Sequence, residues 1–204
     1  MLVRSRSRWL WVLLGAGLAC APAHADSTRE IVGTICLFCH GEAGDSQGAE
    51  FPKLAGQQSR YLRKQLGDFL TGNRQNELMA SFLPFLKVDD FPGLGVYYAD
   101  QKPSPWPASN AALVASGKKL YEDGNTDSGV PACAGCHQPN ALGKDEFPRL
   151  AAQSQTYLLQ QLAHFRNGVR TNDRGRLMQV LAARLSDDEM KALAEYLAGI
   201  QPGP

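Results

Sequence analysis

The 204-residue sequence predicts an all-α protein built from two tandem domains of the same kind. The main observation is a repeat. Residues 36–40 read Cys-Leu-Phe-Cys-His, and residues 133–137, 97 positions later, read Cys-Ala-Gly-Cys-His. Apolar residues in both halves recur at spacings of three and four, as on one face of a packed helix, and no clear alternating strand pattern is present. The features follow the same order in both halves, which indicates a duplicated unit.

Composition narrows the classes of function. The chain has 21 basic and 20 acidic residues and a net charge of +1, which argues against a broad basic face that grips nucleic acid. A hydrophobic content of 44% is enough to build a core. No apolar run reaches the roughly 20 residues of a membrane-spanning helix. Five cysteines are too few for a disulfide scaffold of this length.

The first 25 residues have the three parts of a secretory signal peptide. Three arginines within residues 4–8 form the positive start, residues 9–19 form a short apolar core, and Ala-His-Ala at residues 23–25 is a small-x-small cleavage site. We therefore expect an exported protein whose mature chain follows this site. The alternative is an uncleaved anchor, or a lipoprotein attached at Cys20.

A proline-rich segment divides the rest of the chain into two units. Three prolines fall close together in residues 103–110, which makes this segment an extended and stiff linker. We expect a first domain at residues 26–102 and a second at residues 111–204. A hydrophobic core of this size gives only marginal stability unless a cofactor, metal or covalent link adds to it.

The helices of each unit follow from apolar periodicity. Residues 61–69 and 157–165 share the pattern Tyr-Leu-x-x-Gln-Leu-x-x-Phe, which places the named residues on one helix face. Ser186 and Glu189 predict a capping box at the start of the last helix. The corresponding helix of the first unit contains Pro92, so it should start late and be weaker. The helix before the first cysteine pair is expected to be short.

Each repeated pattern has the form Cys-x-x-Cys-His, the attachment signature of c-type haem. Two thiols three positions apart in a helical turn can reach the two vinyl groups of one porphyrin, and the adjacent histidine then lies under the iron. The sequence therefore predicts two covalently bound haem c groups, each forming the missing core of one domain. The attachment residues are Cys36, Cys39, Cys133 and Cys136, and the proximal iron ligands are His40 and His137.

The cysteine pairs also allow two simpler interpretations. A zinc site would need four ligands from two pairs that are about a hundred residues apart. A thioredoxin-like dithiol would need a strand–helix context that the sequence does not provide. Neither interpretation accounts for a histidine directly after each pair, so both are weaker than the haem prediction.

The sequence resembles the dihaem cytochrome c4 family over residues 26–204. The resemblance is carried by the two haem motifs, the Phe-Pro-Lys/Arg-Leu-Ala segments at residues 51–55 and 147–151, the two Tyr-Leu helices, and Gly-Val-Pro-Ala-Cys-Ala-Gly-Cys-His at residues 129–137. It implies two class I cytochrome c domains related by a pseudo-twofold axis, each wrapped around one haem, with the haem propionates approaching each other at the interface. It also implies a periplasmic carrier between a quinol–cytochrome c reductase and a terminal oxidase such as the cbb3 type. We expect a monomer that associates with the membrane only through such partners.

The sixth iron ligand can be sought among few residues. Met79 and Met178 occupy equivalent positions, in expected loops before the closing helices, and we assign them as axial ligands opposite the histidines. Met190 lies on the apolar stripe of the last helix and is assigned to the core. His164 is the spare imidazole of the mature chain and is assigned to the surface; if it were a ligand, only one haem could be bis-histidine.

Further residues are expected around each haem. Pro52 and Pro148 follow the proximal histidines by 12 and 11 residues and match the class I pattern in which a proline carbonyl accepts a hydrogen bond from the histidine. The simple alternative is an ordinary turn proline. Arg74 and Arg170 recur at equivalent positions and are candidates for propionate contacts, with solvated arginines as the alternative.

These features predict an electron carrier, with one electron per haem, and not an enzyme. A cytochrome subunit of a periplasmic dehydrogenase complex shares all of this chemistry and stays open as an alternative. A dihaem redox enzyme, such as a peroxidase, is disfavoured because the one spare histidine of the mature chain cannot serve both haems and all four of its cysteines are assigned to haem attachment. A basic rim that would steer an acidic partner is expected near the second haem. Its residues are Arg166, Arg170, Arg174 and Arg176.

Overall fold

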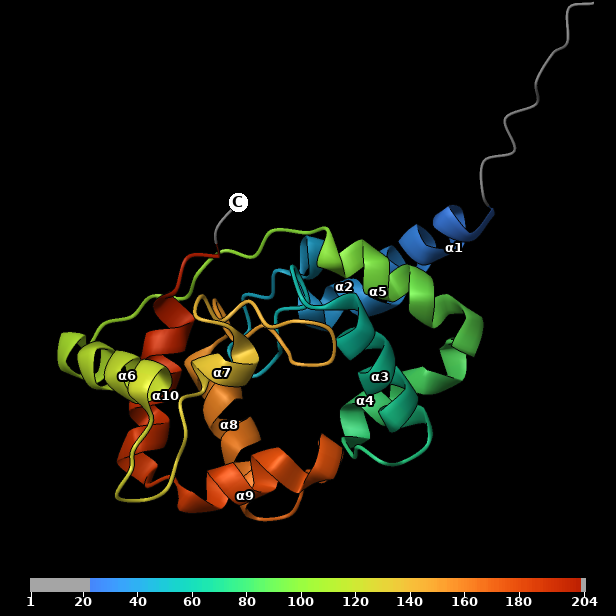
Figure 1. The fold of residues 1–204 in the computed structure, drawn as a ribbon. Helices are drawn as coiled ribbons and strands as arrows, with labels where there is room; N and C mark the ends of the chain where they lie inside the picture. Colours follow the sequence, from blue (N-terminus) through green and yellow to red (C-terminus); the bar gives the residue numbers. More distant parts are fainter. Residues whose placement is uncertain (1–22, 203–204) are drawn as a thin grey trace, which may run out of the picture.

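A computed structural model describes residues 23–202. Most of the predicted export signal, residues 1–22, lies outside this part. Figure 1 shows two groups of helices joined by a long coil, with the first half of the chain on the right and the second half on the left. The described residues contain two isolated β-bridges and no longer strand, as expected for an all-α protein. None of their helices is long and apolar enough to cross a membrane.

The first half begins with a longer helical run than the sequence predicts. Helix α1 continues without a break through a π-helical turn into α2, which ends at the first motif histidine, so the opening helix is not short. The helix predicted over residues 61–69 is confirmed as α3. The helices of this half are α1 (Ala23–Ile31), the π-helix (Val32–Cys36), α2 (Leu37–His40), α3 (Ser59–Leu70), α4 (Glu77–Phe82) and α5 (Phe91–Ala99).

The second half repeats this order with a longer closing helix. The capping box is confirmed, because the Ser186 hydroxyl accepts from the Glu189 amide and the Glu189 carboxylate accepts from the Ser186 amide. The helix predicted over residues 157–165 is confirmed as α8. The helices are α6 (Ala111–Asp123), α7 (Ala134–His137), α8 (Gln155–Arg166), α9 (Leu177–Arg184) and α10 (Asp187–Gly199).

The crossing of α6 and α10 closes the second half. Gly117 of α6 lies so close to α10 that a Cβ atom there would collide with the carbonyl oxygen of Ala192. This close approach buries the apolar stripe of α10, and Met190 is 3% exposed within it, as predicted. Because the two helices touch backbone to backbone, the crossing depends on the missing side chain.

The corresponding closure of the first half is smaller. Helix α5 has 9 residues against 13 in α10 and carries Pro92 in its first turn, in agreement with the expected weaker helix. Its core cluster of buried residues is limited to Val32, Leu62, Leu94 and Tyr98. The first domain therefore has less buried protein surface of its own to hold it together.

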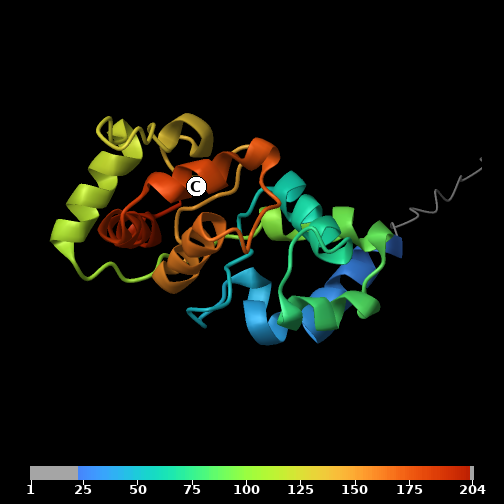
Figure 2. The same cartoon turned by 90° about the horizontal axis from the view of Figure 1, so that it is seen from below.

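A coil at residues 101–110 connects the halves and is anchored to both. It runs along one side of the molecule in Figures 1 and 2. The amide of Trp106 donates to the carbonyl of Ala198 in α10 at 3.0 Å. Ser104 accepts a hydrogen bond from Lys53 of the first half at its carbonyl oxygen, at 2.7 Å. The coil is thus anchored to both halves by hydrogen bonds and keeps them side by side.

Candidate functional site

One continuous cavity of about 560 Å³ extends through both halves. Both cysteine motifs, both motif histidines and both candidate methionines line it. Apolar side chains from α3, α4 and α5 form the first part of the wall, and side chains from α8, α9 and α10 form the second. The residues that the sequence singles out are therefore brought together from separate helices.

The two motif histidines are held in the same way. His40 and His137 are 8% and 6% exposed. Nδ1 of His40 lies 2.9 Å from the carbonyl oxygen of Pro52, and Nδ1 of His137 lies 3.0 Å from that of Pro148. A carbonyl oxygen can only accept, so Nδ1 carries the proton and the Nε2 lone pair is free to bind a metal. Burial lowers the pKa of both imidazoles more than these hydrogen bonds raise it, which keeps the rings neutral.

The cysteines do not have the properties of a redox dithiol. None of the four forms a disulfide within residues 23–202, and all are half-buried. Burial raises the pKa of Cys36 and raises that of Cys133 to about 11, whereas a reactive dithiol needs a lowered thiol pKa. The zinc interpretation also lacks support, since no three His, Cys, Asp or Glu side chains within residues 23–202 are grouped to hold a metal.

The two candidate methionines lie in helices and not in the loops that the sequence predicted. Met79 belongs to α4, and Met178 belongs to α9. The side chain of Asn76 caps α4 by accepting from the Met79 amide at 2.9 Å. Both helices are too short, at 6 and 8 residues, to be recognised from periodicity. Both methionines are half-buried in the cavity wall.

Arg74 and Arg170 form a symmetric link between the halves. Nη2 of Arg74 donates to the hydroxyl of Tyr157 at 2.9 Å, and Nη2 of Arg170 donates to the hydroxyl of Tyr61 at 3.0 Å. Arg170 is 7% exposed and Arg74 is half-buried, so neither is a freely solvated side chain. Their contact with propionates stays a prediction. Both guanidinium groups also donate to Gln65 and Gln161.

A second set of reciprocal hydrogen bonds lies deeper in the interface. The Gln57 side chain donates to the Arg149 carbonyl at 3.1 Å and accepts from the Arg149 amide at 2.7 Å. The Gln153 side chain makes the equivalent pair with Lys53, at 3.2 and 2.9 Å. These four residues occupy equivalent positions of the repeat. The two halves therefore contact each other through the same surface.

Lys53 is a buried cation that sequence reasoning missed. It is 2% exposed, and its Nζ lies 2.7 Å from a carboxylate oxygen of Asp45. The ammonium group also lies 5.1 Å from the centre of the Trp106 ring. A cation between Pro and Leu in the repeated Phe-Pro-Lys/Arg-Leu-Ala segment was the signal available in the sequence.

Arg149, the counterpart of Lys53, is also 2% exposed. Its guanidinium donates to the carbonyl oxygens of Lys53 and Ala151, but its Nε has no hydrogen-bond partner among the described residues. Burial lowers its pKa to about 10, and nearby Asp45 offsets part of this effect, so the group is still a cation at neutral pH. The buried hydroxyl of Tyr98 faces the Cys36 side chain and makes no hydrogen bond to an oxygen or nitrogen atom within residues 23–202.

These features fit two haem groups. The cavity has an apolar wall for a porphyrin, paired thiols and neutral imidazoles at each end, and buried cations between the ends that match anionic propionates. The unpartnered Nε of Arg149 belongs to a cavity-lining residue, as expected where a polar group of a cofactor completes the wall.

Two other sequence assignments have clear outcomes. His164 is half-buried and is not among the residues that line the cavity. The expected basic rim is smaller than predicted, because Arg166 pairs with Asp187 at 2.6 Å and Arg170 is buried in the interface. Arg174 and Arg176 are exposed.

Comparisons with known proteins decide the family. The family model "Cytochrome c" matches residues 114–201. Cytochrome c4 from Thiocapsa roseopersicina is 44% identical over 169 residues, which are 81% of this chain and 87% of that protein. The chain belongs to the cytochrome c4 family. It is therefore a dihaem electron-transfer cytochrome with two covalently attached haem c groups, one in each of two cytochrome c domains.

A solved structure and a second relative extend this result. The crystal structure of reduced recombinant cytochrome c4 from Pseudomonas stutzeri has a TM-score of 0.81 and 39% identity, and the match covers 86% of this chain and 98% of that one. A thiosulfate dehydrogenase electron acceptor from Thiomonas intermedia is 36% identical, with 90% of this chain and 82% of that protein covered. The cytochrome c4 architecture thus spans both domains.

Proposed function

We propose that this cytochrome c4 is a periplasmic carrier that moves electrons, one per haem, from a quinol–cytochrome c reductase to a terminal oxidase such as the cbb3 type. The observation that supports it best is that one cavity contains two complete sets of a motif histidine and a methionine. With haem bound, one histidine and one methionine would supply both protein ligands of each iron, which favours electron transfer over the binding of a small substrate. Bound haem supplies one-electron chemistry between ferric and ferrous iron.

In this proposal each domain contributes the same set of functions. The cysteines of each motif would hold one porphyrin covalently. His40 with Met79 and His137 with Met178 would bind the two irons. The carbonyls of Pro52 and Pro148 fix the imidazole tautomers, which leaves Nε2 free as the ligand atom. Arg74 and Arg170 donate to the tyrosines across the interface and would also donate to the propionates.

A second candidate function follows from the description of relatives of this chain. The relative from Thiomonas intermedia is described as a thiosulfate dehydrogenase electron acceptor. The present chain could serve a periplasmic dehydrogenase in the same way, as an acceptor or as a subunit. Under this alternative the haem ligands and the domain interface are unchanged, and only the electron donor differs.

An optical redox titration of the mature protein, with its near-infrared ferric spectrum, tests the ligand sets. We expect a methionine–iron charge-transfer band that accounts for two haems, and two clearly positive potentials. A band for only one haem, or a strongly negative potential, would contradict the closed carrier. Turnover with quinol–cytochrome c reductase, compared with turnover with a purified thiosulfate dehydrogenase, then separates the two donors.

A further inference from the structure

The outer face of α9 and of the turn before it has a basic surface beside the second haem motif. We call it the cationic face. Leu177 and Val180 are 41% and 48% exposed, and the arginines around them are exposed as well. The cationic face consists of Arg174, Arg176, Leu177, Val180 and Arg184. It therefore combines a small apolar centre with three positive charges.

The arginines of this face form no ion pair with carboxylates of the described residues, and the carboxylate of Asp173 beside them accepts hydrogen bonds from Gln179 instead. Arg174 and Arg176 form no ion pair with any described residue, in contrast to Arg166 on α8. Arg184 donates to the carbonyl of Gly129 at 2.6 Å, which fixes the side chain but leaves its charge uncompensated. The backbone of Arg176 is in the left-handed region, at φ 58°, and its amide donates to the Asp173 carbonyl. The turn is thus built into the structure and presents its arginines outward.

The equivalent face of the first domain has a different chemistry. Alignment of Met79 with Met178 places Glu77 opposite Arg176 and Phe85 opposite Arg184. Phe85 is 68% exposed. The first face therefore carries a carboxylate and exposed apolar groups where the second carries arginines. The equivalents of the cationic face are Gln75, Glu77, Leu78, Ser81 and Phe85.

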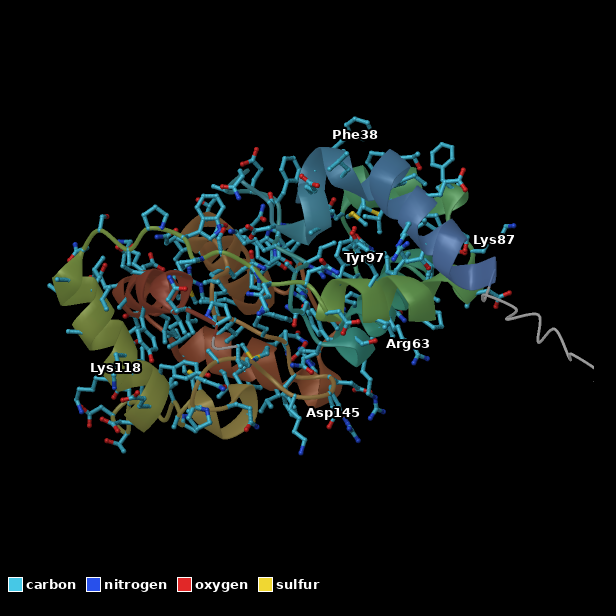
Figure 3. All side chains as sticks on the ribbon, turned by 90° about the horizontal axis from the view of Figure 1, so that it is seen from above. Phe38, Arg63, Lys87, Tyr97, Lys118 and Asp145 are labelled. Carbon is cyan, nitrogen blue, oxygen red and sulfur yellow. The ribbon has the colours of Figure 1, made fainter. Side chains whose placement is uncertain are left out.

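The cationic face reaches the cavity. Arg174 and Leu177 line it together with Met178 and the second pair of motif cysteines. At the first motif the corresponding surface is made bulky by Phe38, which is 79% exposed and points away from the molecule in Figure 3. The second motif has Gly135 at that position. A protein seated on the cationic face would thus lie directly beside the haem site of the second domain.

We propose that the cationic face is the docking surface for an acidic redox protein, which exchanges electrons with the haem of the second domain. The inference rests on the proposed carrier function and adds the chemistry and location of one partner. Unpaired surface arginines steer an acidic protein and raise its association rate, an effect that falls with ionic strength. The exposed Leu177 and Val180 supply the small apolar centre of a short-lived contact. The first domain lacks these charges, so the same partner does not dock there.

The experiment compares two charge reversals in the haem-loaded protein. The test variant is Arg174→Glu with Arg176→Glu. The control is Lys118→Glu with Lys119→Glu on α6, which changes the net charge equally; these lysines are 54% and 77% exposed. Lys118 lies at the end of the second domain that is farthest from the first domain (Figure 3). The probe is plant plastocyanin, an acidic blue-copper protein, as oxidant of the reduced cytochrome in stopped flow.

We expect the test variant to react about tenfold more slowly at low ionic strength and to lose most of the salt dependence, while the control stays near the unmodified rate. An equal loss in both variants, or no loss in the test variant, would overturn the docking surface. Arg174→Gln with Arg176→Gln should give an intermediate rate. The spectrum and redox titration of each variant are recorded first, because a failure there contradicts the proposed carrier and its ligands, whereas unchanged spectra with unchanged rates contradict only the docking surface.

Discussion

The guanidinium of Arg170 donates a hydrogen bond to the hydroxyl of Tyr61, 109 positions earlier and in the other domain, at 3.0 Å. Arg170 is 7% exposed, so its charge is stabilised mainly by partners contributed by both domains. Burial alone would raise the pKa of the Tyr61 hydroxyl, but the positive charges of Arg170 and Arg74 outweigh this effect and lower it. The interface is therefore a shared polar layer and not a simple apolar contact.

Replacing Arg170 by Gln should uncouple the domains. The change leaves the Tyr61 hydroxyl without its donor and should cost about 1–3 kcal/mol of interface stability. Urea unfolding followed by the haem absorbance of each domain should change from one transition to two. Arg63→Gln, at an exposed position of α3, is the control and should leave a single transition. A single transition in both variants would show that the layer does not couple the domains.

Met178 and Met190 should respond differently to replacement by Ala. Met178→Ala removes a proposed iron ligand, so the methionine–iron band should fall by about half and one potential should drop. Met190→Ala creates a cavity in the core and should lower the free energy of unfolding by about 2–5 kcal/mol. Its near-infrared spectrum should be unchanged. If Met190→Ala removed the band instead, the ligand assignment in the second domain would be wrong.

Two glycine-to-alanine substitutions should change the stability of the protein in opposite directions. Gly117→Ala places a methyl group against the Ala192 carbonyl and should force α6 and α10 apart, with a loss of several kcal/mol. Gly67→Ala in α3 meets no atom within 4 Å and should stabilise the protein by about 0.5–1 kcal/mol through helix propensity. Thermal unfolding measures both. A small effect of Gly117→Ala would mean that the helix crossing is not close-packed.

The contact between Asp45 and Lys53 should make stability depend on acid pH. Burial alone would raise the pKa of Asp45, but hydrogen bonds from Lys53 and Ser104 outweigh it and hold the pKa below the usual 3.8. A carboxyl whose pKa is lowered by folding stabilises the protein above its unfolded pKa, and this contribution is lost as the pH falls through the folded pKa.

Asp45→Asn should therefore lower the melting temperature at pH 7 but have little effect near pH 2. Since Lys53 is left buried without a carboxylate, the expected loss at pH 7 is about 1–3 kcal/mol. Melting curves from pH 2 to pH 7 measure it, with Asp89→Asn at an exposed site as the control. An equal loss at all pH values would indicate a steric cause.

The sequence predicted the local features well. The helix faces of α3 and α8 and the capping box at Ser186 depend on residues within three or four positions of each other, and all three are confirmed. The π-helical turn that joins α1 to α2 and the short helices around Met79 and Met178 were not predicted, since each is shorter than the window over which periodicity can be recognised.

The interface could not be read from the sequence in the same way. An arginine such as Arg170 is normally expected at the solvent-exposed surface. Its partner Tyr61 belongs to the other domain and comes close only when the two domains pack together. The burial of Lys53 depends on a carboxylate at Asp45 and on a linker residue that returns to cover it. Such contacts join positions far apart in the chain, so they cannot be predicted from the pattern of neighbouring residues.

The reciprocal bonds of Gln57 with Arg149 and of Gln153 with Lys53 have a consequence for the pairing of the two units. Equivalent residues exchange equivalent contacts, which is the defining property of an isologous, self-complementary contact in a homodimer. A single one-haem unit with this surface is therefore self-complementary and able to pair with a second copy of itself. Because both units lie in one chain, they need not stay identical, and Glu77 and Arg176 occupy matching positions with opposite charge.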